Sequence, residues 1–397
     1  MRLDFKIKYL LLICLIFLNI GKFNSQTTTN TCFKTGADRP ELYLHLLKSK
    51  KVGVVTNQTG LLSDKTHLVD FLVSKSVEIK RIFAPEHGFR GDADAGETVK
   101  NGLDKKTGIP IVSLYGSNKK PTKEQVQDLD FILFDIQDVG VRFYTYISTL
   151  TYVMEAAGEN GVEVIVLDRP NPHDGYIDGP ILKEKWVSFV GMHKIPVIYG
   201  LTIGEYGKMV NGEKWLAKGI EANYTVIPML DYHKTKRYGM LDRPSPNLPN
   251  DLSINLYPSL CFFEGTEVSV GRGTEYPFQV YGSPWIKKLD FAFTPKPTYG
   301  AKNPFLNGQE CYGENLTKYP KDLRELNLEW LLKAYKNYSN SSRNFFLSNL
   351  FFDKLAGSDE LRNQIIEGKS ETEIRTSWKT DLEEFEKIRS KYRIYPD

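Results

Sequence analysis

The sequence is poor in the residues and motifs that hold metals and nucleotides. Its 397 residues include only four cysteines and six histidines, and no two histidines stand one helical turn apart, as they do in many zinc hydrolases. The first expected strand is followed by Asn57-Gln58-Thr59-Gly60 rather than by spaced glycines. A lysine-containing phosphate loop and a Gly-x-Ser-x-Gly elbow are both missing. We therefore expect no metal and no cofactor, and carboxylates are the strongest nucleophiles that the sequence offers.

An excess of charge of one sign is also lacking. The chain has 52 basic and 49 acidic residues, which gives a formal net charge of +3. It carries no polycationic arm and no acidic tail, so we expect no nucleic-acid partner. A hydrophobic content of 41% is enough for a sizeable core, and the length indicates two domains. The expected partner is a small molecule or a neutral polymer.

Long apolar runs are lacking except near the N-terminus. There the residues 9–18 form an apolar stretch that follows Arg2, Lys6 and Lys8 and precedes a polar segment. This order is that of a signal peptide, which we place at residues 1–25. We expect an exported protein, periplasmic or secreted, with no stable membrane insertion after signal removal. An uncleaved anchor is the alternative, although the run is short for a membrane span.

The cysteines give little basis for disulfide bonds. Cys14 lies inside the apolar stretch and leaves with it, so that Cys32, Cys261 and Cys311 remain. An odd number at wide spacing forms neither a disulfide framework nor a zinc site of closely paired thiols.

Between residues 53 and 227, apolar β-branched runs alternate with helical patterns, which indicates βαβ units around a mostly parallel sheet. The expected strands are 52–56, 77–83, 111–114, 131–134, 162–167 and 197–199. The expected helices between them are 67–75, 123–127, 147–158 and 203–211. Most of these strands are apolar throughout, as in a sheet covered on both faces, whereas 77–83 alternates and is expected nearer an edge.

The pattern changes at a proline-rich passage, residues 243–250, which cannot form a regular helix. A block rich in aromatics and glycine follows at 262–285, and helices are expected at 328–338, 359–367 and 371–391. We therefore place an N-terminal α/β domain with a Rossmann-like, mostly parallel sheet at 26–240 and a smaller C-terminal α+β domain at 241–397.

Polar side chains stand where three of the expected strands end. Glu86 and His87 follow the second strand, Asp135 follows the fourth, and Asn171 lies just after the fifth. The carboxyl ends of parallel strands meet at one edge of an open α/β sheet, which is where such sheets place their chemistry. We expect these groups to share one rim.

Glu86 is the leading candidate for a general acid. Hydrolysis of a glycosidic bond needs a carboxylic acid that protonates the leaving oxygen and a second group that stabilises or attacks the sugar carbon. Ile82 and Phe83 give Glu86 apolar neighbours, which favour a protonated carboxyl group. The alternative is a surface glutamate at a strand-to-loop turn.

A second carboxylate, Glu264, stands between a two-phenylalanine run and a glycine. Arg272 follows within the sequence Gly271-Arg272-Gly273-Thr274 and is expected to pair with Glu264 or with an anionic substrate. Aromatics and glycines around these charges are typical of a carbohydrate cleft. A purely structural ion pair between Glu264 and Arg272 is the alternative.

A third group of polar residues lies at 135–146. Asp135, Gln137, Asp138, Arg142 and Tyr144 offer carboxylates, an amide, a cation and a phenol that could grip sugar hydroxyls, an acetamido group or a carboxylate. In the alternative interpretation, Asp138 caps the following helix and Arg142 neutralises it.

Four ordered motifs together resemble the NamZ-type exo-β-N-acetylmuramidase family. They are Phe83-Ala84-Pro85-Glu86-His87-Gly88, the segment 135–146, Leu167-Asp168-Arg169-Pro170-Asn171-Pro172, and Phe263-Glu264-Gly265-Thr266 with 271–274. The resemblance runs from about residue 53 to the C-terminus. It implies a Rossmann-like domain, a smaller C-terminal domain and an active-site cleft between them.

The resemblance also implies a glycoside hydrolase that releases N-acetylmuramic acid from the non-reducing end of peptidoglycan fragments such as MurNAc-GlcNAc. Glu86, Glu264, Asp135 and His87 match its catalytic positions. The expected substrate-binding residues are Asn57, Gln137, Asp138, Arg142, Tyr144, Asn171, Arg272 and Glu275. Arg142 or Arg272 is expected to hold the lactyl carboxylate of muramic acid. The rival interpretations are an exported glycan-binding protein without turnover and a nucleotide-dependent enzyme.

Overall fold

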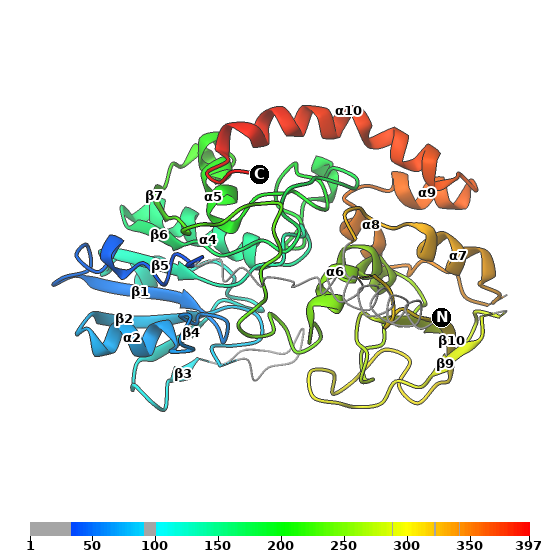
Figure 1. Ribbon diagram of the computed structural model, residues 1–397, viewed down its shortest axis with the longest axis horizontal. Coiled ribbons are helices and arrows are strands. Elements are labelled where there is room, and N and C mark those ends of the chain that lie inside the picture. The colour runs from blue at the N-terminus through cyan, green and yellow to red at the C-terminus, as the bar shows by residue number, and fades with distance from the viewer. Residues whose placement is uncertain (1–32, 91–100, 288, 321–322, 341) are drawn as a thin grey trace, which may run out of the picture. The chain divides into compact units, whose positions relative to one another are not determined.

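A computed structural model describes residues 33–90, 101–287, 289–320, 323–340 and 342–397. The expected signal peptide and Cys32 lie outside these residues. Seven strands form one sheet in the order β3-β4-β2-β1-β5-β6-β7, in which every neighbouring pair is parallel except β3 with β4 (Figure 1). The strands are β1 (Lys51–Thr56), β2 (Glu78–Ala84), β3 (Gly102–Leu103), β4 (Pro110–Ser113), β5 (Phe131–Asp135), β6 (Glu163–Leu167) and β7 (Asn223–Ile227).

Helices cover both faces of this sheet, because alternate residues of each strand point to opposite sides. In β5, Leu133 packs on one face with residues of α2, whereas Ile132 and Phe134 pack on the other with residues of α4 and α5. The helices of this lobe are α2 (Leu68–Ser74), α3 (Lys123–Val126), α4 (Tyr146–Asn160) and α5 (Ile203–Gly212). The predicted Rossmann-like, mostly parallel sheet is confirmed. We call the described residues between 33 and 240 the large-sheet lobe.

Two strand predictions in this lobe are wrong. Residues 197–199 make only isolated bridges, from Ile198 to Val141 and to Asp178, and the strand beside β6 is β7. The sequence of β7 is polar and partly exposed, as befits an edge, and so it lacks the apolar run that marked the other strands. The second expected strand is not near an edge either, since β2 lies between β4 and β1.

The second part of the chain, which we call the small-sheet lobe (residues 251–389), is mainly helical around a three-stranded antiparallel sheet of order β8-β10-β9. Its strands are β8 (Val280–Ser283), β9 (Phe291–Phe293) and β10 (Cys311–Asn315). Its helices are α6 (Asp251–Leu260), α7 (Glu329–Asn337), α8 (Phe351–Ala356), α9 (Glu360–Ile366) and α10 (Glu371–Arg389). Short 3₁₀ helices occur at η1 (Pro40–Leu42), η2 (Glu184–Trp186), η3 (Ala217–Gly219), η4 (Cys261–Gly265) and η5 (Ser390–Tyr392). Helices α7, α9 and α10 were predicted, whereas α6 and α8 were not.

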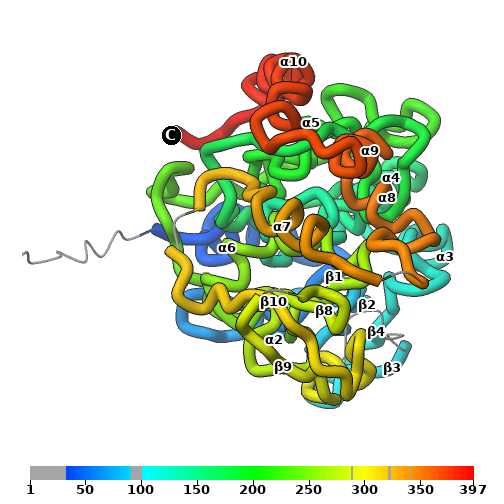
Figure 2. The backbone as a smooth tube through the Cα atoms, turned by 90° about the vertical axis from the view of Figure 1, so that its right-hand side faces the viewer, coloured from blue at the N-terminus to red at the C-terminus, as the bar shows by residue number. Residues whose placement is uncertain are grey.

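The residues after α10 pack against the large-sheet lobe. Helix α10 runs back from α9 to the large-sheet lobe (Figure 1), and η5, which follows α10, contacts α5. In Figure 2 α10 is seen nearly end-on at the top of the molecule. Tyr392 donates a hydrogen bond to Glu213 just after α5, at 2.8 Å, and Lys234 donates from its backbone nitrogen to the carbonyl of Pro396 at 3.0 Å. The last residues therefore belong to the packing of the first lobe.

Candidate active site

A pocket of about 800 Å³ is lined by residues of both lobes. The large-sheet lobe contributes residues that follow β2, β4 and β5, so the pocket opens at the carboxyl edge of the parallel sheet, as the strand-end argument predicts. The small-sheet lobe contributes residues of α6, η4, α8 and the loops 272–278 and 300–305. Of the predicted site residues, the pocket brings together Glu86, His87, Tyr144, Glu264 and Arg272.

Glu86 reaches the pocket from a tight turn after β2. The backbone nitrogen of Gly88 donates to the carbonyl of Pro85 at 3.0 Å, and His87 has a positive φ of 71°, which is uncommon for a residue with a side chain. Such strained backbone persists where its surroundings hold it, and it clusters at functional sites. His87 is buried, and its position in the turn directs Glu86 to the cavity.

Neutral hydroxyl groups hold the Glu86 carboxylate. Tyr115, just after β4, donates to Oε1 at 3.0 Å, and Thr145, the residue before α4, donates to Oε2 at 3.2 Å. Burial and the Glu86 carboxylate raise the pKa of Tyr115 above its ordinary value, so the phenol keeps its proton and acts as a donor. The loops that follow β2, β4 and β5 thus come together at the Glu86 carboxylate.

Glu264 forms an ion pair with an arginine. Arg272 Nε donates to Oε1 at 2.7 Å, and the Cys261 thiol donates to Oε2 at 3.5 Å. Burial works against the charge of Arg272, yet Glu264 raises the pKa of Arg272 above its ordinary value. Burial, and then Glu264, raise the pKa of the Cys261 thiol well above its usual range, so that the thiol stays protonated. The ion pair expected from the sequence exists, and both of its members line the pocket.

Two glycines place Arg272. Gly271 and Gly273 have positive φ values of 77° and 81°, a conformation that glycine adopts without cost. A Cβ at Gly273 would also lie 2.6 Å from the carbonyl oxygen of Lys296 and 2.7 Å from Pro304. This explains the spaced glycines of the motif without any nucleotide, since they form a sharp turn that presents one guanidinium. Nη1 of Arg272 is buried and has no hydrogen-bond partner among the described residues.

Aromatic side chains form much of the pocket wall and connect the lobes. Tyr144 donates to the carbonyl of Pro244 at 2.8 Å and packs edge-on against Tyr257 of α6, with ring centroids 5.8 Å apart. Phe143 makes similar edge contacts with Tyr257 and Phe262. Apolar walls with a few convergent polar groups are typical of small-molecule sites.

Several predicted site residues lie outside the pocket lining. Asp135 is fully buried and forms a two-point ion pair with Arg169, at 2.6 and 2.9 Å. Asp138 accepts from the Tyr199 hydroxyl at 2.5 Å and from the nitrogen of Gly140, and burial raises the pKa of Asp138 to about 6. It does not cap α4, which begins after Thr145.

Arg142 was expected to contact substrate, and the structure gives it other partners. Its side chain is fully buried, and its guanidinium donates to the carbonyls of Pro180, Ile195 and Leu355 at 2.7–2.8 Å. Leu355 belongs to α8, so this arginine ties the small-sheet lobe to the large one. It is too deeply enclosed to reach a sugar carboxylate, whereas Arg272, the other arginine expected to do so, lines the pocket.

The remaining amides also face protein groups. Asn57 donates to the Tyr146 hydroxyl at 2.8 Å, Gln137 to the carbonyls of Asp138 and Pro170, and Asn171 to the carbonyl of Leu201 at 2.8 Å. All three side chains are buried. Glu275 is exposed and is not part of the pocket lining.

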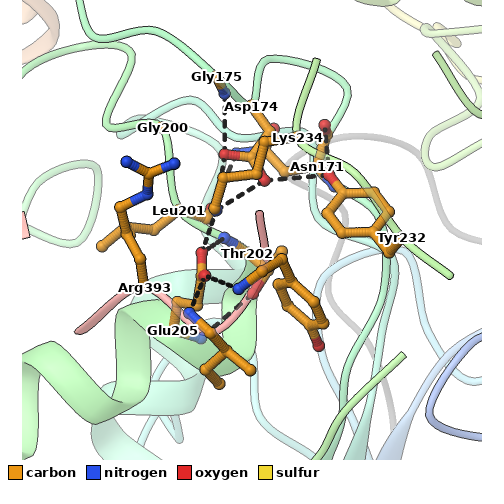
Figure 3. Close-up of polar contacts among 12 residues, drawn as sticks. Asn171, Asp174, Gly175, Gly200, Leu201, Thr202, Glu205, Tyr232, Lys234 and Arg393 are labelled. Carbon is orange, nitrogen blue, oxygen red and sulfur yellow. Dashed lines mark hydrogen bonds and ion pairs between the residues drawn. The ribbon is translucent and has the colours of Figure 1, made fainter. Parts of the chain in front are cut away.

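A buried network of charges lies beyond these amides, at the same edge of the sheet (Figure 3). Lys234 is fully buried and pairs with both oxygens of Asp174, at 2.9 and 3.0 Å, and with Glu205. The other Glu205 oxygen accepts from the backbone nitrogen of Ile394 at 2.6 Å. Tyr395 donates to Asp168 at 2.6 Å, and burial raises the pKa of Asp168 to about 6. The network thus fixes the C-terminal segment.

The pocket also contains residues that the sequence argument missed. They include Tyr115, Tyr257, Cys261, Lys302, Asn303 and Phe305. Tyr115 follows the third expected strand, so applying the strand-end rule to that strand would have found it. The loop 300–305 carries no pattern that marks it.

The described residues contain no group of three or more His, Cys, Asp and Glu side chains that could hold a metal ion. Cys261 and Cys311 are free thiols. No helix among the described residues is long and apolar enough to span a membrane.

Comparisons with known proteins agree along most of the chain. Residues 52–252 match the family model for the N-terminal part of the exo-β-N-acetylmuramidase NamZ, and residues 255–395 match the model for its C-terminal part. The peptidoglycan β-N-acetylmuramidase NamZ of Bacillus subtilis (strain 168) is 40% identical over 393 residues, which cover 94% of this chain and 93% of that protein.

Solved structures with the same fold come from Bacteroides fragilis. One DUF1343 family protein has a TM-score of 0.85 and 42% identity, with 92% of this chain and 99% of that chain covered. A second has a TM-score of 0.77 and 29% identity, with 91% and 99% covered.

Proposed function

Because this chain belongs to the NamZ exo-β-N-acetylmuramidase family and is a glycoside hydrolase of peptidoglycan, we propose that it releases N-acetylmuramic acid from the non-reducing end of MurNAc-GlcNAc fragments. The observation that carries the proposal is the convergence of Glu86 and Glu264, from different lobes, on one pocket of about 800 Å³. A pair of carboxylates is the usual equipment for glycoside hydrolysis.

The partners of the two carboxylates support different roles. Two hydroxyl groups contact Glu86, and a hydroxyl can donate to a carboxylate or accept from a carboxylic acid. Glu264 is held by a guanidinium, which can only donate and which binds a carboxylate best. We assign Glu86 as the general acid and Glu264 as the carboxylate that faces the sugar carbon.

Recognition of muramic acid is assigned to Arg272. The lactyl group that distinguishes muramic acid from glucosamine is a carboxylate, and Arg272 lines the pocket with a side chain that is 23% exposed. A hydrogen bond between a guanidinium and a carboxylate is worth about 1.5–3 kcal/mol. Arg272→Ala is expected to reduce the preference for muramides over glucosaminides about tenfold, measured as the ratio of kcat/KM values.

The control for this test is Arg343→Ala, which removes an arginine that is 55% exposed and paired with Glu267 in the same lobe. It should leave the ratio unchanged. Loss of activity in Arg272→Ala without any change in the ratio would contradict the assignment, because the arginine would then only support Glu264.

We further propose that the protein is exported and that residues 1–25 are its signal peptide. The basic residues before an apolar stretch in the sequence support this, and so does the substrate, since peptidoglycan lies outside the cytoplasmic membrane. Expression of the full chain, followed by N-terminal sequencing of the mature protein, tests the proposal.

The first experiment uses the chain without its signal, a chromogenic β-N-acetylmuramide and the matching glucosaminide. Cleavage selective for the muramide is expected, reduced at least about 10²-fold in Glu264→Gln and about tenfold in Glu86→Gln, because a chromogenic phenolate leaves without a proton. Glu221→Gln, which alters a surface carboxylate that is 65% exposed, is the control. Binding of muramides without turnover would instead indicate a glycan-binding protein.

A further inference from the structure

The loop from Tyr299 to Phe305 lines part of the pocket and carries two exposed aromatic rings. Phe305 lines the pocket and is 45% exposed, and Tyr299, next to the lining residue Gly300, is 60% exposed. Lys302 and Asn303 of the same loop also line the pocket. Ligand pockets are lined mostly by apolar and aromatic side chains, with a few polar groups among them.

The loop is held rigidly in this position. Thr298 and Ala301 exchange two backbone hydrogen bonds, at 3.0 and 3.1 Å, and the buried Asn247 side chain donates to the carbonyl of Gly300 at 2.7 Å. Pro304 packs on Gly273, where no Cβ would fit. The same glycine turn that presents Arg272 therefore also seats the loop.

The rings of Phe305 and Tyr299 face outward because of the residues beside them. Pro304 and Leu306 are both buried, so Phe305 between them is directed out of the protein. Tyr299 lies against the Arg243 guanidinium, whose Cζ is 4.9 Å from the centroid of the ring, and this contact holds the ring in place. An exposed ring on a fixed loop loses little conformational entropy when it binds.

We propose that Phe305 and Tyr299 form the binding subsite for the sugar on the reducing side of the cleaved bond, an inference that depends on the proposed function. When the muramic acid unit lies at Glu86 and Glu264, the rest of the glycan must leave through the mouth of the pocket. An N-acetylglucosamine unit has an apolar face of C–H groups that packs on aromatic rings, and an acetamido group that pairs with the Asn303 amide. The occupant of this surface is therefore the N-acetylglucosamine unit that becomes the leaving group.

The test compares two muramides that differ only after the cleaved bond. One is MurNAc-GlcNAc, and the other is methyl β-N-acetylmuramide, which releases methanol in place of a sugar. We expect Phe305→Ala to lower the ratio of kcat/KM for the disaccharide to that for the methyl glycoside about five- to tenfold, with a smaller effect from Tyr299→Ala. Tyr312→Ala, which removes a ring that is 38% exposed and outside the pocket lining, should leave the ratio unchanged.

The outcomes are separable. An unchanged ratio in both Phe305→Ala and Tyr299→Ala, while the unaltered protein cleaves both muramides, would overturn the subsite and leave the proposed function standing. Failure of the unaltered protein to cleave either muramide would overturn the proposed function, and the subsite with it. A change that appears only with substrates carrying a stem peptide would assign the rings to the peptide and overturn the sugar subsite. Because both rings are exposed, thermal unfolding of the variants should match that of the unaltered protein.

Discussion

The acidic residues at the carboxyl edge of the large sheet fall into two sets that differ in their surroundings. Asp135, Asp168, Asp174 and Glu205 are almost wholly inaccessible, and protein donors occupy their oxygens from several sides. Glu86 lies at the same edge but in the pocket wall, held by two hydroxyl groups. Position at a strand end therefore does not by itself give a residue a chemical role. The buried set organises the loops, and the pocket set is available to a substrate.

The largest expected effect is a loss of activity, which distinguishes Glu86 from the buried acidic residues. A sugar leaving group needs a proton and a nitrophenolate does not, so Glu86→Gln should lower kcat/KM about 10³-fold on MurNAc-GlcNAc and only about tenfold on 4-nitrophenyl β-N-acetylmuramide. Equal losses on the two substrates would show that Glu86 is not the acid. Thermal unfolding of the variant should stay close to that of the unaltered protein.

The next effect concerns stability. Asp135→Asn leaves the buried Arg169 guanidinium without its countercharge, which should cost about 3–5 kcal/mol in the free energy of unfolding, while the folded fraction keeps its kcat/KM. Urea unfolding with activity measured on the same samples checks this. Glu221→Gln, in an exposed pair with Lys214, is the matched control and should cost under about 0.5 kcal/mol. A stable but inactive Asp135→Asn would return Asp135 to the catalytic residues.

The pH dependence of stability tests the buried position of Asp138. Its pKa is raised by burial to about 6 in the folded protein, against 3.8 for the ordinary group, so its contribution to stability is full below pH 4 and falls as the pH rises through 6. Asp138→Asn lacks this titration. The difference in free energy of unfolding between the variant and the unaltered protein should therefore shift by about 2–3 kcal/mol in favour of the variant from pH 4 to pH 7.5, measured by urea unfolding. A difference that does not change with pH would contradict the buried position of Asp138.

The smallest effect concerns the C-terminal segment. Tyr395→Phe removes one hydroxyl that donates to Asp168 and accepts from the nitrogen of Met229, which should cost about 1–2 kcal/mol without change in kcat/KM. Tyr276→Phe, at an exposed tyrosine, serves as the control. Unfolding free energies that match for both variants would mean that the segment is not fixed by this hydrogen bond.

The contrast between the two sets also explains what the sequence could and could not predict. The apolar runs predicted the sheet, and its strand ends together with the motifs predicted Glu86, Glu264 and Arg272 as pocket residues. The same rule could not separate Glu86 from Asp135, because whether a strand-end side chain faces a cavity or the interior depends on partners far away in the sequence, such as Arg169. The buried position of Arg142 could not be predicted for the same reason, because its carbonyl partners come from three separate segments.

Other features lacked a local signal altogether. The strand β7 is polar because it is an edge, and the loop 299–305 is irregular and owes its position to contacts with Gly273 and Asn247. Only the folded chain brings these segments to the pocket and to the sheet.

The attachment of the C-terminus to the large sheet has a consequence for biosynthesis. Asp168 and Glu205 obtain partners from Tyr395 and Ile394, which are synthesised only after the small-sheet lobe. A buried carboxylate without its partners costs several kcal/mol, so the edge of the first lobe cannot close before residues 394–395 have been made. Domains generally fold in the order of their synthesis, N-terminal first. Here the first lobe to emerge is completed only by residues that follow the second lobe.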